Sequence, residues 1–568
     1  MKNYLLLSGV AVSVLALTLG GGVTGALAAD LPLKAQPAAY WSWAGFYVGT
    51  QSSAYAGHTK FDDPFGPSIF GDRAFTPGYA WGGLIGYNWQ SGNFVYGLEA
   101  DANLLDSRGT VTCAAFSGFY SSSNCRAHPN AFGSVTARVG WALGPEGRTL
   151  VYGKGGFAWQ HNDVSVTLNN NFFLATPTTT TSLTQTGWTV GAGVERALTP
   201  AWSVKFEYDY MNFGHHGNVT IPASVFGPVA IIGNIAFFDA VGAATSRVSS
   251  DAHVFKVGLN YKIGQDPWSA PFGGPVSAPI YAKAPPRAWA PGWEFEGGGR
   301  YWYSWGRFQK DLPPAGGSND QSLISRLTYK NTANTGEFFG RIDTPMNFFL
   351  KGNIGGGRIN SGHMNDEDWG IFGIVDYSNT ISNKVTGPLF FFTTDVGYDF
   401  LRGPGYKVGG FVGFNQLRYT MDAGGCVQIA NPFSDCVGAG AVPTSVLVIT
   451  EHGTWNSLRL GMSAQTVLGD RWKLSGEVAY VPYTKFTGTD NHILRDLIIN
   501  EQGHGHGVQA EGFLTYMVTD AFSLGVGGRY WALWTTSGSD VFGGVPLTRN
   551  DTYRTDRAGV TFQGSYRF

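Results

Sequence analysis

Two short polar segments hold the side chains of this sequence that are best suited to chemistry. They are Asn365-Asp366-Glu367-Asp368-Trp369 and Gly488-Thr489-Asp490-Asn491-His492. In an extended backbone, side chains two residues apart project to the same side, so Asp366 pairs with Asp368 and Asp490 pairs with His492. A carboxylate that orients a histidine, opposed by a carboxylate pair, can activate a water molecule. The alternative is an ordinary polar loop, because Asp, Asn and His are common loop residues.

The rest of the chain is patterned as β-strands that would carry these segments. Apolar and polar side chains alternate in residues 202–210, and residues 255–263 and 560–568 repeat the pattern. Such alternation is typical of a strand with one face toward lipid and the other toward a polar lumen. Short turns also alternate with long polar connections, as in outer-membrane barrels. The predicted fold class is therefore all-β, with antiparallel transmembrane β-barrels.

A proline-rich segment divides the chain. Residues 264–291 lack alternation, which predicts a semi-extended periplasmic linker. About eight strands precede it in residues 29–263, and about ten follow it in residues 292–568. We expect two tandem barrels rather than one barrel of about eighteen strands, because a closing strand directly precedes the linker.

Within the second predicted barrel, the third and seventh strands stand roughly opposite each other. We expect these two strands to end outside the membrane near Gly362 and Phe486. The two polar segments that follow them would then face each other across the extracellular mouth of the barrel.

The composition and the N-terminus indicate an exported membrane protein. A basic start, an apolar run and an Ala-x-Ala motif predict a secretory signal peptide over residues 1–28. Only 14% of the residues are charged, whereas 15% are aromatic and 81 are glycine. A soluble domain carries about 25% charged residues, so we predict the bacterial outer membrane as the location. The formal net charge of −2 gives no reason to expect nucleic acid as a partner.

The four cysteines form two close pairs, Cys113 with Cys125 and Cys426 with Cys436. In an exported chain such pairs are most simply disulfides, and we expect each to close a polar extracellular loop. A metal site is the alternative, but neither pair has a clustered histidine. His504 and His506 also lack an apparent third ligand, so we predict solvated loop histidines and no metal site.

Several motifs of the first predicted barrel match a known family. They are Trp43-Ala44-Gly45-Phe46-Tyr47-Val48-Gly49, Ile85-Gly86-Tyr87-Asn88-Trp89-Gln90, Gly97-Leu98-Glu99-Ala100-Asp101 and Gly187-Trp188-Thr189-Val190-Gly191-Ala192-Gly193-Val194-Glu195. With them, residues 30–263 resemble the small porin-family surface antigens of alphaproteobacteria. The resemblance implies an eight-stranded surface barrel that is structural or adhesive and has no active site.

A different set of motifs marks the second predicted barrel. They are Ser325-Arg326-Leu327, Met364-Asn365-Asp366-Glu367-Asp368-Trp369, Arg418-Tyr419-Thr420 and Asp490-Asn491-His492. With them, residues 320–568 resemble the omptin family of outer-membrane endopeptidases, which cleave polypeptides at the cell surface. The resemblance implies that His492 is the general base on a water, that Asp490 orients it, and that Asp366 and Asp368 complete the water site.

The chain departs from the omptin pattern at positions that concern specificity. Omptins favour basic residues at the cut through acidic groups in a deep pocket, and they need lipopolysaccharide. Gly488 replaces the family's pocket aspartate, and Asp311 is the candidate for another substrate-binding acid. Arg418 stands at a family position for lipid phosphate, beside Gln416 at a position that is acidic in the family. Arginine suits phosphate, whereas an ordinary lumen or girdle charge is the alternative for Arg418.

The leading hypothesis is a two-barrel outer-membrane protein whose second barrel is an omptin-like, aspartic-type endopeptidase. It would act on polypeptides and use no cofactor other than lipopolysaccharide. The alternative is a non-catalytic structural or adhesive protein, or a narrow porin. Both hypotheses place the chain in the same membrane, so only a cleavage measurement separates them.

Overall fold

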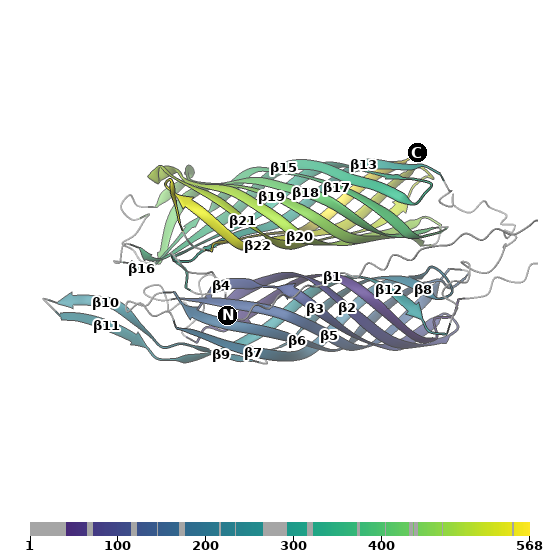
Figure 1. The fold of residues 1–568 in the computed structure, drawn as a ribbon, viewed down its shortest axis with the longest axis horizontal. Helices are drawn as coiled ribbons and strands as arrows, with labels where there is room; N and C mark the ends of the chain where they lie inside the picture. Colours follow the sequence, from purple (N-terminus) through teal and green to yellow (C-terminus); the bar gives the residue numbers. More distant parts are fainter. Residues whose placement is uncertain are drawn as a thin grey trace, which may run out of the picture.

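The computed structural model consists of antiparallel strands that wind into two closed rings, which lie side by side (Figure 1). It describes residues 41–64, 72–114, 122–144, 146–169, 177–214, 217–232, 235–264, 292–314, 322–371, 375–403, 405–430, 436, 441–468, 470–547 and 550–568. The predicted signal peptide and residues 265–291 of the predicted linker lie outside these described residues. No helix in the described part of the chain is long and apolar enough to cross a membrane.

The first ring closes where β12 pairs with β1 in antiparallel register. Its strands are β1 (Gly45–Phe61), β2 (Arg73–Ser91), β3 (Phe94–Ser107), β5 (Ser123–Leu143), β6 (Thr149–Leu168), β7 (Thr178–Ala197), β8 (Trp202–Asn212) and β12 (Ala244–Lys262). Additional strands lie at one end: β4 (Gly109–Cys113), β9 (Asn218–Ile221), β10 (Ser224–Ile232) and β11 (Ile235–Val241). The expected closure of this barrel by the strand before the linker is confirmed.

The second ring closes where β15 pairs with β14, and β24 pairs with β13. Its strands are β13 (Glu294–Leu312), β14 (Ser325–Asp343), β15 (Phe348–Ile371), β17 (Lys384–Gly403), β18 (Tyr406–Ala430), β19 (Val442–Leu468), β20 (Trp472–His492), β21 (Leu497–Met517), β22 (Phe522–Phe542) and β24 (Thr552–Arg567). The shorter elements are β16 (Val375–Ser382), η1 (Ile493–Arg495) and β23 (Val545–Pro546). Two separate rings confirm the tandem barrels and exclude a single large one.

The outward side chains form an apolar belt around each barrel, which suits a lipid environment. On β20 the belt ends near Tyr483, which is 50% exposed. The strand nevertheless continues to His492, and its next outward residues, Lys485 and Thr487, are polar and exposed. The strands therefore extend beyond the membrane on the side of the long connections, which is the extracellular side of such barrels. The expected strand ends near Gly362 and Phe486 are wrong for this reason.

The lumen of the first barrel is filled by buried ion pairs. Pairs that join different strands include Lys154–Glu207 at 2.9 Å, Lys205–Glu99 at 3.1 Å, Lys256–Asp209 at 2.7 Å and Arg138–Glu195 at 3.1 Å. Charges buried in this way need partners, because an unpaired charge in a lumen of low polarity is costly. The network leaves a filled interior, as expected for eight strands.

A layer of aromatic side chains crosses the lumen of the second barrel. Its members include Trp302, Phe308, Tyr329, Phe391, Tyr419, Trp455, Phe486, Trp531 and Tyr553, all of them buried. Neighbouring rings contact edge to face or at a tilt, with Trp455 and Phe486 centroids 4.6 Å apart. The layer closes the lumen beneath its extracellular mouth.

The outer faces of the two barrels pack against each other through rings and small residues. Phe206 and Phe255 of the first barrel project toward Gly476 and Gly512 of the second. A Cβ added at Gly476 would lie 3.0 Å from the Phe206 ring, so glycine allows the close approach here. Around this contact the described residues form one buried apolar cluster that spans both barrels.

Candidate active site

A β-bulge turns each of the two polar segments into the lumen of the second barrel. In β15, the pairing with β14 shifts by one residue at Asn360, and in β20 the pairing with both neighbours shifts near Pro482. One extra residue moves every later side chain to the other face of a strand. Lumen-facing positions are therefore odd-numbered below each bulge, as at Ile359 and Val481, and even-numbered above it. All four predicted catalytic residues lie above the bulges at even-numbered positions.

The structure brings the predicted Asp-His pair together in the mouth. His492 Nε2 lies 3.1 Å from Asp490 Oδ2, and the Lys310 ammonium donates to the same carboxylate oxygen. Asp490 is completely buried, whereas the His492 side chain keeps 12% exposure toward the mouth. Burial disfavours ionisation of Asp490, but Lys310 and His492 outweigh it and hold its pKa well below the usual range. Asp490 is therefore a carboxylate that fixes the imidazole.

The aspartate pair lies on the opposite wall, on β15. Burial raises the pKa of Asp366 well above its usual value, and the negative charges of Asp368 and Asp490 raise it further. Asp490 therefore acts electrostatically on Asp366 across the lumen. Asp366 Oδ1 is buried and has no hydrogen-bond partner among the described residues. The site thus favours the protonated form of Asp366, whose Oδ1 is available to a molecule that enters the mouth.

Three further charged groups belong to the site and were missed from the sequence. Lys310 Nζ lies 2.9 Å from Glu501 and 3.8 Å from Glu451, in addition to its contact with Asp490. All are completely or almost completely buried. The alternation of lumen-facing and outward residues could have found Lys310, because Trp302, Phe308 and Lys310 share the lumen face of β13. The lysine supplies the cation that this cluster of carboxylates needs.

Glu501 also occupies the space beside Gly488. A Cβ added at Gly488 would lie 2.9 Å from Glu501 Oε2. A carboxylate of the neighbouring strand β21 therefore lies next to the position where Gly488 has no side chain. This carboxylate is already paired with Lys310.

We expect the stability of the folded barrel to fall as pH rises from about 4 to about 7. Burial raises the pKa of Glu501 to about 7 against the opposing effect of Lys310, whereas an unfolded glutamate releases its proton near ~4.3. Between these values the folded state binds more protons, so a rise in pH favours unfolding. Urea titrations of the refolded protein at several pH values measure this slope.

The variant Glu501→Gln should flatten the slope, because the amide imitates the protonated acid. The matched control is Asp470→Asn, in an exposed turn between β19 and β20. Identical pH slopes for wild type and Glu501→Gln would contradict the assignment.

The structure does not bring Asp311 to this group. Its side chain lies on the outer face of β13, buried, where the Arg326 guanidinium donates to both carboxylate oxygens at 2.8 and 3.1 Å. Burial disfavours its ionisation, but Arg326 outweighs that effect and lowers the pKa of Asp311. Asp311 therefore has an ion-pair partner outside the lumen and no access to a substrate there.

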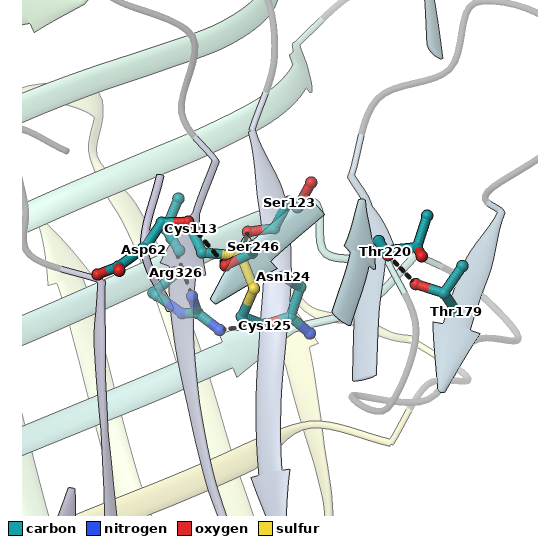
Figure 2. Close-up of a disulfide and its surroundings, with 10 residues drawn as sticks. Asp62, Cys113, Ser123, Asn124, Cys125, Thr179, Thr220, Ser246 and Arg326 are labelled. Carbon is teal, nitrogen blue, oxygen red and sulfur yellow. Dashed lines mark hydrogen bonds between the residues drawn. A yellow bond between two sulfur atoms is a disulfide. The ribbon is translucent and has the colours of Figure 1, made fainter. Parts of the chain in front are cut away.

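The Asp311–Arg326 pair contacts a hairpin of the first barrel formed by β4 and the start of β5. Thr110 donates to Asp311 at 2.6 Å, and Arg326 donates to Thr112 at 2.9 Å. Figure 2 shows Arg326 reaching Asn124 beside the Cys113–Cys125 disulfide, at 2.7 Å. The first barrel therefore contacts the outer faces of β13 and β14, and β14 pairs with β15, which carries Asp366 and Asp368.

Two further bonds extend this contact along β15. Thr112 donates to Glu367 at 2.9 Å, and the Trp369 indole donates to Ser122 at 2.6 Å. Glu367 and Trp369 lie directly beside the two aspartates in the chain, but on the outward face.

Both predicted disulfides are confirmed, Cys113–Cys125 and Cys426–Cys436. They do not close simple loops: Cys113 lies on β4, Cys125 on β5 and Cys426 on β18, beyond the apolar belt. The expectation that they lie in loops is wrong for these three residues, because the strands are longer than the membrane requires, whereas Cys436 lies in a turn outside the strands.

The remaining predicted residues lie outside the lumen. Arg418 is exposed on β18 between the buried Leu417 and Tyr419, and its role with lipopolysaccharide stays a prediction. His504 and His506 lie on β21 rather than in a loop. His506 Nδ1 is 3.3 Å from Asp106 of the first barrel.

Comparison with known proteins identifies both parts of the chain. The model of the outer membrane protein beta-barrel domain matches residues 25–262, and that of the Omptin family matches residues 319–565. A 31 kDa outer-membrane immunogenic protein of Brucella melitensis is 32% identical over 254 residues, 42% of this chain and 94% of the relative. A 22 kDa outer membrane protein of Rhizobium leguminosarum is 33% identical over 172 residues, 30% of this chain and 65% of the relative.

Among solved structures, the outer membrane protease OmpT of Escherichia coli aligns with a TM-score of 0.41 at 15% identity. The alignment covers 48% of this chain and 97% of that protein. Both matched families consist of outer-membrane proteins, which confirms the predicted location. This chain joins two parts that match families of the bacterial outer membrane: its N-terminal part belongs to the outer-membrane β-barrel family, and its C-terminal part matches the model of the Omptin family over residues 319–565.

Proposed function

We propose that the second barrel is an endopeptidase that cleaves polypeptides at the cell surface with an activated water. The observation that carries the proposal is the His492–Asp490 bond at 3.1 Å in a lumen mouth that also holds the buried Asp366. The aromatic layer beneath it closes the lumen. This layer disfavours the porin alternative for the second barrel, because a pore needs a continuous polar path.

In this proposal His492 is the general base. Its Nε2 faces Asp490, which leaves Nδ1 to accept a proton from water as the water oxygen attacks the peptide carbonyl carbon. The imidazolium then returns that proton to the amide nitrogen as the carbon–nitrogen bond breaks. Asp490 stabilises the imidazolium, and Lys310 keeps Asp490 ionised.

Asp366 and Asp368 would hold the other side of the water and the carbonyl oxygen. The raised pKa of Asp366, which burial causes first, favours the protonated form of this carboxyl. A protonated carboxyl can donate to the carbonyl oxygen as negative charge develops there.

The cleavage preference should differ from a strict demand for basic residues. Glu501 is the carboxylate beside Gly488, and Lys310 already neutralises part of its charge. A positively charged substrate side chain would therefore gain less binding free energy here than in a pocket whose carboxylates have no lysine partner. We assign no substrate contact to Asp311, because it is buried against Arg326.

The test is cleavage of a mixture of peptides by refolded protein, with and without lipopolysaccharide, followed by mass spectrometry of the products. Cleavage that depends on the folded barrel supports the proposal, and the cut sites give the preference. Absence of cleavage under both conditions would favour the structural or adhesive alternative. The filled ionic lumen of the first barrel favours a purely structural role for that part.

A further inference from the structure

A cavity of about 1690 Å³ lies between the two barrels. Its walls are outward faces of both rings, so it lies at the level of the apolar belts. The apolar lining includes Phe206, Tyr208 and Phe255 of the first barrel with Trp305, Leu514 and Val560 of the second. A drug-sized ligand fills a pocket of about 300–1,000 Å³, so this space suits a bulkier apolar occupant.

The charged residues of the cavity lining that face outward gather at its extracellular end. Arg307 and Lys330 are paired across β13 and β14, directly above the belt residue Trp305. Arg307 is held by Asp556 at 3.7 Å, whereas Lys330 has no ion-pair partner among the residues that the structure describes. His58 lines the same end from the first barrel. An anion at this level would complete the pairing.

Arg307 and Lys330 form a basic rim at the extracellular end of the cavity, and protein covers the space directly above this rim. Thr110 of the first barrel accepts from Arg554 at 2.7 Å and from Gln309 at 3.0 Å. Gln309 and Arg554 each lie two residues beyond the rim residues Arg307 and Asp556 on the same strands. A bound molecule therefore has a compact headgroup, because a long polar extension would meet this contact.

We propose that the cavity binds one diacyl glycerophospholipid. Its acyl chains lie along the aromatic lining, and its phosphate contacts Lys330 and Arg307. The three observations that carry the proposal are the apolar depth, the unpartnered cation at headgroup level and the protein cover above it. The same cover disfavours lipopolysaccharide, whose sugar chain would have to pass through it. The proposal does not depend on catalysis.

Two matched pairs of variants test the site. Lys330→Met removes the rim cation, and Lys485→Met is the control, an outward, exposed lysine of β20 that does not line the cavity. Gly528→Trp fills the cavity, since Gly528 lines it and a Cβ there would meet only the Gly559 carbonyl oxygen, at 3.9 Å. Gly336→Trp is its control, an exposed outward glycine of β14 with nothing within 4 Å of an added Cβ.

The measurement is native mass spectrometry of the full-length protein after extraction from membranes and delipidation, with lipids identified in organic extracts. Wild type and both controls should retain about one phospholipid per chain. Lys330→Met and Gly528→Trp should each retain at least about tenfold less, the first because it loses a charge-assisted contact and the second because the indole occupies the space of the acyl chains. Folding of each variant is checked by its heat-modifiable electrophoretic mobility.

Equal phospholipid retention in Gly528→Trp and Gly336→Trp would overturn the proposal. Retention of lipopolysaccharide instead of phospholipid, with loss in the same variants, would overturn the assigned headgroup class.

Discussion

Replacing His492 by alanine should reduce the rate of peptide cleavage by about 10²–10⁴-fold, the usual contribution of a general base. Asp490 is completely buried and held by Lys310, so it should remain in place. The loss should fall on kcat rather than on KM, because His492 acts on the water and not on substrate binding. Single-turnover cleavage of the peptide found by the product survey measures both quantities.

The matched control is His504→Ala. His504 is an exposed histidine on β21 that contacts Ser537 and lies outside the lumen. Its replacement should leave cleavage unchanged. If wild type and His492→Ala cleave at the same rate, His492 is not the base, and the proposed mechanism fails even if the barrel is a protease.

Replacing Arg326 by methionine should destabilise the protein by about 3–5 kcal/mol, the usual cost of leaving a buried ion-pair partner without its counterion. Arg326 is 2% exposed and makes hydrogen bonds to Asp311, Thr112 and Asn124. The variant leaves Asp311 charged and buried at the contact between the barrels. Methionine keeps most of the apolar length, so the loss reports the charge rather than a cavity.

Urea unfolding of the refolded protein measures this loss, and Arg358→Met is the matched control because Arg358 is exposed on the neighbouring strand β15. Asp311 has a lowered pKa in the wild type, so its pairing adds stability above about pH 3.9 and loses it as the carboxyl is protonated below that value. The difference in the free energy of unfolding between variant and wild type should therefore become smaller at acid pH. A difference in unfolding free energy that is small at neutral pH, or unchanged at acid pH, would contradict the role assigned to Arg326.

The pair of barrels could be predicted from the sequence because alternation of period two is a strong local signal. The alternation in residues 202–210 and 255–263 predicted β8 and β12, and each barrel closes as expected. The strand ends could not be predicted in the same way. Above the belt both faces of a strand are polar, as around Asn365 and Thr489, so the alternation disappears while the strand continues.

The choice between Lys310 and Asp311 shows a second limit. Both are charged and adjacent, and they differ only in that the side chains at even-numbered positions of β13 face the lumen. This alternation of odd and even positions also fails to predict the direction of a side chain beyond a bulge, as at Asn360 and Pro482. The contact between Arg326 and the β4–β5 hairpin could not be predicted at all, because it joins residues more than 200 positions apart.

The two bulges have a consequence for how such barrels diverge. A substitution at Asn360 changes one side chain, whereas loss of that single codon reverses every side chain from residue 361 to the end of β15. Asp366 and Asp368 would then point at the neighbouring barrel, and Glu367 would point into the mouth. A deletion of one codon in such a strand would therefore rearrange the whole mouth of the barrel, whereas a replacement in the site alters a single side chain.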